Sequence, residues 1–311
     1  MTLGRDNPTW CHPSGTLARD GWDCIVDDRV PGWGHTALRT TTLTAGGAVE
    51  MGLGDHEAVV VPLTGGVTVD VVGGPDEDMS LTLTGRDGVF AGPTDVAYVP
   101  PGTTLRLRAP ADWPAGVSVR VAACLARTSG TPGLRAYRLD AADVPVELRG
   151  AGIASRQVRN FGVPGVLEAQ RIIACEVITP AGNWSSWPPH KHDTDRPGVE
   201  AELEEIYWFE TRSTDPRGTD AVGYQRVYGT PERPIDVLAA VSTGDVVLVP
   251  HGWHGPAIAA QDADLYYLNV MAGPGDERAW LICDDPAHAW VRETWANEKP
   301  DPRLASKSPR S

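Results

Sequence analysis

The first half of the chain alternates short runs of β-branched residues with turns rich in glycine and proline. Runs of about four to eight such residues, bounded by chain breakers, are typical of strands. We predict a hairpin where EAVVVPL and VTVDVV flank Thr64-Gly65-Gly66. The other strands predicted in this half cover 81–84, 96–99, 104–107 and 117–123.

The second half repeats the pattern and is also predicted to be all-β. Its predicted strands cover 166–178, 203–209, 222–228, 236–241, 245–249 and 264–271. Strands at this spacing, without helices between them, favour a sandwich or a barrel. The one clear helix signal lies near the end, where Asp284 or Asp285 could cap, Pro286 occupies the first turn and AHAWVRETWANE follows without a breaker.

Between the halves lies the stretch 126–151, which is rich in breakers and charge and which we interpret as a connection between two lobes. The length of 311 residues agrees, because a typical domain has about 150. GRDGVFAGPTDVAYVPPGT and TGDVVLVPHGWH share a glycine-containing turn, a strand and a second turn, which suggests a duplication. We expect one barrel over 1–140 and a second over 141–311.

Composition and charge narrow the choice of partners. The chain has 41 acidic and 27 basic residues and a net charge of −14, so its field repels nucleic acid and anionic membranes. No apolar run approaches the roughly 18 residues of a membrane span, and the first residues lack the apolar core of a signal peptide. Five scattered cysteines form no CxxC pair and argue against a cysteine zinc site. We expect a cytoplasmic protein with a small-molecule ligand, and leave open whether it forms a homo-oligomer.

Four of the eight histidines form two tight groups in the second half: His190 with His192, and His251 with His254. Residues two apart on a strand share a face, so His190 and His192 should project together while Lys191 points away. Two imidazoles on one face supply part of the ligand set of a metal ion. The alternative is a pair of surface histidines in a proline-flanked loop.

The sequence that follows strengthens the metal interpretation. An acid opens the strand LEEIYWFE, and another histidine follows the Pro-His-Gly turn of GDVVLVPHGWH. The chain thus has two histidines, then an acid on the next strand, then a histidine after a PxG turn. This order resembles the metal signature of the cupin superfamily. The resemblance favours Glu205 over Glu204 as the ligand, and strand alternation places Glu205, Tyr207 and Phe209 on one face.

The cupin resemblance implies a divalent ion, zinc, manganese or iron, in the second barrel. Its implied ligands are His190, His192, Glu205 and His254. His251 sits inside the turn and is the less favoured alternative to His254.

Several longer phrases resemble one group of cupins, the 5-deoxy-glucuronate isomerases of myo-inositol degradation. They are NWSSWPPHKHD, ELEEIYWFE, QRVYG, GDVVLVPHGWH and DLYYLNVMAGP, together with GRDGVFAGPTDVAYVPPGT in the first half. The resemblance implies an all-β bicupin, two tandem barrels with a short C-terminal helix, that interconverts an aldehyde sugar acid and its ketone isomer. The first half has no HxH pair, so we expect its barrel to be structural.

Such an isomerisation moves two hydrogens between adjacent carbons, and a metal would stabilise the enediolate. The sequence leaves the base open among a metal-bound hydroxide, Glu176, and Tyr266 or Tyr267. A carboxylate substrate in an acidic protein needs a local cation. We predict Arg226 first and Arg171 second for this role, with Tyr267 also contacting the substrate. The alternative for either arginine is an outward side chain paired with a surface acid.

Two other functions remain open at this point. A cupin with the same ligands can be a dioxygenase that uses iron and molecular oxygen, or a non-catalytic protein that binds sugar acids. Oxygen consumption on addition of substrate would identify the first, and binding without turnover would identify the second.

Overall fold

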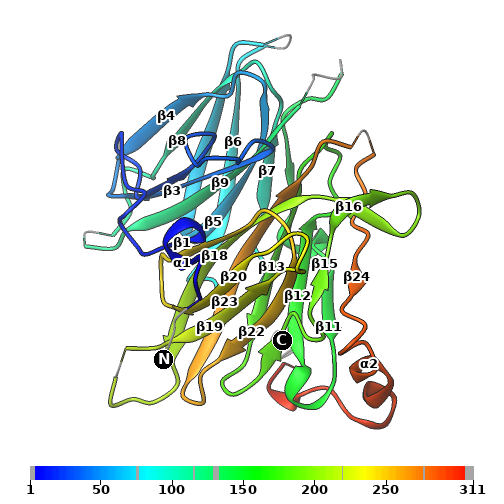
Figure 1. Cartoon of the computed structure of the whole chain (residues 1–311). Helices are drawn as coiled ribbons and strands as arrows, with labels where there is room; N and C mark the ends of the chain where they lie inside the picture. Colours follow the sequence, from blue (N-terminus) through cyan, green and yellow to red (C-terminus); the bar gives the residue numbers. More distant parts are fainter. Residues whose placement is uncertain are drawn as a thin grey trace.

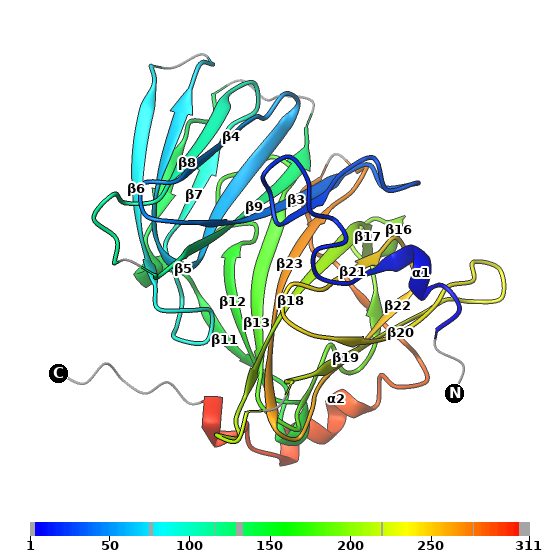
Figure 2. The ribbon, with the colours of Figure 1, turned by 90° about the vertical axis from the view of Figure 1, so that its left-hand side faces the viewer.

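The strands of the two halves build two lobes that lie one above the other (Figures 1 and 2). This computed structural model describes residues 4–74, 77–114, 116–128, 133–218, 220–275 and 277–304. The first lobe contains β2 (Cys24–Val26), β3 (Thr36–Leu43), β4 (Ala48–Gly52), β5 (His56–Val72), β6 (Met79–Arg86), β7 (Val96–Val99), β8 (Thr104–Arg108), β9 (Val119–Arg127) and β10 (Tyr137–Leu139). One path through its sheet runs β10-β7-β5-β9-β3-β2; β6 and β8 also pair with β5, and β4 pairs with β8.

The predicted hairpin at Thr64-Gly65-Gly66 is wrong, because β5 continues through these residues as one strand. Its first part pairs with β7 and β9, and its second part pairs with β6 and β8. The register shifts between Pro62 and Thr64 and again between Gly65 and Val67, and Gly65 has a φ of +77°. The glycines therefore mark bulges that bend a long strand from one sheet layer to the next.

The second lobe is built from two facing sheets. Its strands are β11 (Val146–Arg149), β12 (Arg156–Gly162), β13 (Ile173–Thr179), β14 (Trp184–Ser185), β15 (His190–Lys191), β16 (Asp193–Arg196), β17 (Glu200–Glu202), β18 (Glu204–Ser213), β19 (Gly223–Tyr228), β20 (Asp236–Val241), β21 (Val246–Val249), β22 (Trp253–Ala259), β23 (Ala263–Ala272) and β24 (Cys283–Asp284). One sheet has the order β21-β18-β23-β13-β12-β11, extended beyond β21 by β1 (Cys11–His12), and the other has β20-β19-β22-β15-β24 with β14 beside β22. A separate hairpin is formed by β16 and β17.

Both ends of the described chain pack on the second lobe. Near the N-terminus, α1 (Asn7–Trp10) contacts β20, and β1 (Cys11–His12) pairs with β21. The predicted C-terminal helix is confirmed but is shorter than its sequence signal, because only Val291–Thr294 (α2) is α-helical, followed by one 3₁₀ turn at Trp295–Asn297. It lies at the end of the second lobe far from the first lobe (Figures 1 and 2). No helix in the described residues is long and apolar enough to cross a membrane.

The large sheets of the two lobes pack face to face, so both of their faces are buried. A shared core lies between the lobes, and each barrel has an interior core of its own. Alternate residues of strand β18 contribute to two of these cores. Its Ile206 and Trp208 contribute to the shared core, whereas Tyr207 and Phe209 fill the second barrel.

Two buried glutamates join the lobes in a reciprocal way. Glu204, at the start of β18, accepts hydrogen bonds from the backbone N–H groups of residues 34–36 in the first lobe. Glu57, in β5, accepts them from the backbone N–H groups of residues 170–172 in the second lobe, and from the hydroxyl of Tyr98. The matching contacts support a duplicated barrel and make Glu57 the counterpart of Glu204.

A buried charge cluster also crosses the interface between the lobes. Arg86 of β6 makes a two-point ion pair with Glu176 of β13, which also accepts a hydrogen bond of 2.7 Å from the Tyr266 hydroxyl. Arg159 lies 3.6 Å from the same carboxylate. Burial alone would raise the pKa of Glu176, but the arginines outweigh it and lower the pKa, so the carboxylate is ionised.

Candidate metal centre

Three of the four predicted ligands converge inside the second barrel. His192 follows β15, Glu205 lies in β18 and His254 lies in β22, and all three are buried. Their ligand atoms lie within 4.8 Å of one another. Nε2 of His192 is 3.1 Å from Oε2 of Glu205, and Nε2 of His254 is 3.2 Å from the same oxygen. Glu205 reaches the barrel interior, whereas Glu204 is used between the lobes, as alternation on β18 predicts.

The positions of the Nδ1 atoms of the two histidines suit a metal ion. Nδ1 of His192 lies 3.1 Å from the carbonyl oxygen of Leu203, and Nδ1 of His254 lies 3.2 Å from that of Gly252. Each Nδ1–H can donate to its carbonyl, which leaves both Nε2 lone pairs directed at the carboxylate. Nε2 of His254 is a buried nitrogen without a hydrogen bond of acceptable geometry. Three acceptor atoms facing one another in a buried site fit a cation between them.

The carboxylate of this group is held in its charged form. Burial would raise the pKa of Glu205, but the pKa falls to about 2 when the imidazoles of His192 and His254 donate hydrogen bonds to the carboxylate, and a cation between the three groups would favour the ionised carboxylate in the same way. Glu205 is therefore an anionic ligand over the whole physiological pH range.

His190 lies beside this group but is not part of its tight cluster. Its ring centroid is 4.5 Å from that of His254 and 6.4 Å from that of His192, and its Nδ1 lies 3.4 Å from the Pro188 carbonyl oxygen. The four-ligand set thus remains a prediction, with His190 adjacent to the other three. His251 instead approaches the Pro234 carbonyl, at 3.4 Å.

The first barrel offers no comparable cluster among the residues that the structure describes. If Glu57 corresponds to Glu204, the position corresponding to Glu205 is Ala58, which packs in the interior of the first barrel. An alanine there removes the only acidic ligand. The structural role of the first barrel stays a prediction.

Three hydroxyl groups lie next to the candidate metal centre. The hydroxyl of Ser186 is 3.4 Å from that of Tyr207 and 3.2 Å from that of Tyr267, and the Tyr207 ring centroid is 6.2 Å from that of His254. Burial raises the pKa of both tyrosines, so their phenols are protonated at neutral pH and can donate hydrogen bonds. Tyr267 thus lies beside the candidate metal centre, and its contact with a substrate stays a prediction.

The other candidate bases point away from the site. Glu176 and Tyr266 bond each other in the interface between the lobes, on the opposite face of the sheet from Cys175 and Tyr267. Their place in the sheet therefore excludes them as groups that touch a substrate at the metal centre.

Gln225 is a polar residue of the barrel interior that we did not predict from the sequence. It is fully buried between inward-facing residues of β19 and β22, and neither its amide oxygen nor its amide nitrogen has a hydrogen-bond partner in the described residues. A buried amide without partners suits a site that receives polar groups of a ligand. Gln225 could have been found from the sequence because it lies two residues before Val227 on the same strand and therefore shares its inward face.

A pocket rich in arginine opens beside His190. It has a volume of about 170 Å³ and is lined by Arg149, Arg156, His190, Trp280, Ile282 and Arg292. The arginines come from β11, β12 and α2, and β24 brings the C-terminal segment against β15. The lining residues come from the β11–β12 hairpin, from His190 and from the segment 280–292, which lie far apart in the sequence, and no spacing pattern indicated the pocket.

The structure does not bring Arg226, the first choice for the substrate carboxylate, to the candidate metal centre. Its neighbours Gln225 and Val227 are buried in the barrel wall, whereas Arg226 is part-exposed and lies over the Tyr228 ring. Its guanidinium is paired with Asp236 and with the Val237 carbonyl. Arg226 is thus an outward arginine that already has an acidic partner.

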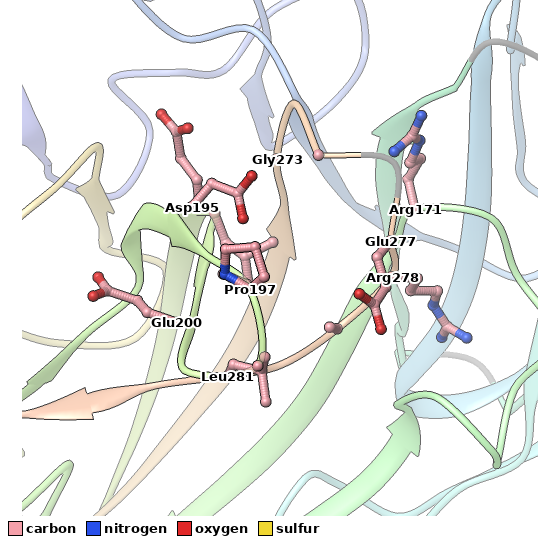
Figure 3. A pocket seen from close by; sticks show the side chains of 14 residues that line it. Arg171, Asp195, Pro197, Glu200, Gly273, Glu277, Arg278 and Leu281 are labelled. Carbon is pink, nitrogen blue, oxygen red and sulfur yellow. The ribbon is translucent and has the colours of Figure 1, made fainter.

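Arg171, the second choice, lines a different hollow of about 180 Å³ (Figure 3). Across this hollow lie Asp195, Pro197 and Glu200 of the β16–β17 hairpin region. None of the predicted metal ligands lines it. Arg278 lines the same hollow as Arg171, donates hydrogen bonds to three backbone carbonyls and therefore has a structural role.

Lys191 points away from the candidate metal centre, as predicted. Its ammonium group binds Asp193 and the buried Glu200, and Asp193 accepts a 2.8 Å hydrogen bond from the backbone N–H of Gly252. These contacts hold the β16–β17 hairpin against the turn that precedes His254.

We expect Lys191→Ala to keep the metal and to lower the free energy of unfolding by about 1–3 kcal/mol, because two carboxylates lose a charged donor. Metal analysis and thermal unfolding of the purified variant would check this. Loss of the metal from a variant that unfolds like the wild type would contradict the position of Lys191.

The two stacked β-lobes and the His–Glu–His cluster in the second barrel define a bicupin with a candidate metal centre. The KduI/IolB family model matches residues 10–291, and the chain belongs to this family. It is 38% identical over 282 residues to the 5-deoxy-glucuronate isomerase of Geobacillus kaustophilus, covering 91% of this chain and 95% of that protein. It is 35% identical over 261 residues to the enzyme of the same name from Bacillus licheniformis, covering 83% and 88%.

Solved structures agree with the fold. An IolB-like protein from Salmonella typhimurium matches with a TM-score of 0.76 and 29% identity, over 91% of this chain and 99% of that one. Oxalate decarboxylase from Lactobacillus farciminis matches with a TM-score of 0.59 over 88% of each chain, at 11% identity, so it supports the fold alone.

Proposed function

We propose that this protein is a metal-dependent aldose–ketose isomerase that converts 5-deoxy-glucuronate to 5-dehydro-2-deoxy-gluconate in myo-inositol degradation. The relatives that cover most of the chain bear the name of this enzyme. The observation that carries the proposal is the convergence of two imidazole nitrogens and one carboxylate on a single point inside the second barrel. Isomerisation needs a Lewis acid more than a nucleophile, and this donor set suits a divalent ion.

Different residues of the second barrel would bind the metal ion and the substrate. His192, Glu205 and His254 would hold the ion, with His190 as the proposed fourth ligand. When bound, the ion would act as a Lewis acid toward the substrate oxygens, where negative charge develops. The neutral phenols of Tyr207 and Tyr267 would donate hydrogen bonds to substrate oxygens, and the buried walls around them would exclude water.

Gln225 would contribute to substrate orientation. Its amide has an unused donor and an unused acceptor in the barrel interior, and sugar hydroxyl groups can pair with both. Such pairs favour a polyhydroxy chain over an apolar ligand of the same size.

The metal itself is proposed as zinc, manganese or iron. Two neutral imidazoles and one carboxylate are ligands that all three ions accept. Loading the metal-free protein with each ion and comparing the rates at equal occupancy would rank them.

Turnover of 5-deoxy-glucuronate in air and under argon would test the reaction type. We expect equal rates in the two atmospheres, loss of activity with a chelator and recovery when a divalent ion is restored. Oxygen consumption in step with turnover would instead identify a dioxygenase. Tight binding of the sugar acid without any product from fully metal-loaded protein would identify a binding protein.

A further inference from the structure

We propose that the arginine-rich pocket beside His190 binds the carboxylate group of the substrate, and that Arg156 is its main contact. The identity of the substrate rests on the proposed function. The preference for an anionic end group rests on the pocket itself, which is lined by Arg149, Arg156 and Arg292.

Arg156 is a buried cation that forms no ion pair with an acidic side chain among the residues that the structure describes. Its relative exposure is 5%, and its hydrogen bonds go to two backbone carbonyl oxygens, at 3.0 Å on Ala154 and 3.3 Å on Trp187. Its guanidinium also lies 5.6 Å from the ring centroid of Trp295. No carboxylate in the described part of the chain forms an ion pair with it. An unpaired buried charge is costly unless something compensates for it.

The two flanking arginines differ from Arg156 in this respect. Arg149 makes a two-point pair with Glu147, at 2.9 and 2.7 Å, and Arg292 makes a two-point pair with Asp284. Three guanidinium groups thus face two carboxylates, which leaves one excess positive charge at the pocket. Burial and the two neighbouring arginines lower the pKa of Arg156 to about 10, so it remains a cation at neutral pH.

The pocket adjoins the candidate metal centre. His190 lines it, and the His190 ring centroid is 4.5 Å from that of His254. A short sugar acid with its carboxylate at Arg156 can therefore extend past His190 toward the metal ligands. Trp280 and Ile282 give the same pocket an apolar side, which suits the methylene group next to the carboxylate of a 5-deoxy sugar acid.

Calorimetric binding of a charged and a neutral ligand would test the pocket. A suitable charged probe is 2-deoxy-gluconate, which has the terminal carboxylate and the adjacent methylene but no carbonyl to isomerise; 2-deoxy-gluconamide is its neutral partner. Metal-loaded wild-type protein should prefer the acid by about ten- to a hundred-fold, the value of a charge-assisted contact. Arg156→Gln should bind both about equally, with the amide affinity and the metal content unchanged.

Arg226→Gln is the matched control, because this arginine is outside the barrel and paired with Asp236. It should keep the full preference for the acid. If Arg156→Gln does not fold, Arg156→Lys retains the charge and should weaken binding of the acid alone by roughly ten-fold, since a lysine cannot make a two-point contact.

An unchanged ratio of acid to amide affinity in Arg156→Gln would overturn the proposal. So would an unchanged acid affinity in Arg156→Lys, or a wild-type protein without any preference for the acid. The binding test needs no turnover, so its result is independent of the isomerase proposal. A pocket that selects the acid through Arg156 in a protein that does not isomerise would refute the function and retain the carboxylate site.

Discussion

Replacing Glu205 by glutamine should empty the metal centre and reduce kcat/KM by at least about a thousand-fold. Glutamine has nearly the same shape but no charge, so the cation loses its only anionic ligand among the three that converge. Lewis-acid stabilisation contributes several kcal/mol to such a reaction, and each 1.36 kcal/mol is a factor of ten in rate. Metal analysis and turnover of the same preparation would measure both effects.

Glu204→Gln is a closely matched control for this change. It makes the same substitution one position earlier, where the carboxylate faces the first lobe and binds the backbone N–H groups of residues 34–36. This variant should keep its metal and become less stable. If Glu205→Gln retained one equivalent of metal and full activity, the metal would have to be held elsewhere.

A second large effect is expected at Glu176, where glutamine should lower the free energy of unfolding by about 3–5 kcal/mol. The substitution removes the carboxylate that pairs with Arg86 and Arg159 in the described structure and leaves these two arginines without that counter-charge. Denaturant unfolding would measure the loss. The metal content and the activity of the folded variant should stay at wild-type values, because Glu176 does not face the barrel interior.

A surface ion pair is the control for the stability effect expected at the buried Glu176. Asp215 pairs with Arg217 on the surface, and Asp215→Asn should change the unfolding free energy by less than about 1 kcal/mol. Equal stability of Glu176→Gln and the wild type would contradict the buried cluster. If the Glu176→Gln variant folded and bound metal but had lost catalysis, Glu176 would again be a candidate for the catalytic base.

The alternation of side chains along the strands was the sequence pattern that predicted the most features of the candidate site. The cupin resemblance favoured Glu205 over Glu204, and alternation put Glu205 on the same face as Tyr207 and Phe209. In the structure that face of β18 lines the barrel interior, whereas the other face contributes to the core between the lobes. The all-β fold and the short C-terminal helix followed from the same runs and breakers.

Several strands escaped prediction because tertiary contacts determine them. Strand β12 carries Arg156 and Arg159, which are buried by contacts with distant residues and give its sequence a polar appearance. Strand β22 contains Gly255 and Pro256 and therefore resembles a turn. The glycines of β5 gave the same signal as a hairpin, although they form bulges in a continuous strand.

A strand position alone does not define which arginine lines a pocket. Arg226 was chosen for its place in the metal-binding barrel, yet it points outward to Asp236. Arg149, Arg156 and Arg292 meet only because β11 pairs with β12 and the C-terminal segment folds back along β15. Contacts across such sequence distances leave no local pattern.

The most direct test of the isomerase function is a proton NMR time course of 5-deoxy-glucuronate with fully metal-loaded protein. We predict that the signal of the aldehyde proton disappears while the signals of 5-dehydro-2-deoxy-gluconate grow in equal amount, and that Glu205→Gln leaves the substrate unchanged. A metal-loaded wild-type protein that left the aldehyde signal intact, or a Glu205→Gln variant that converted it at the wild-type rate, would contradict a metal-dependent isomerase centred on Glu205.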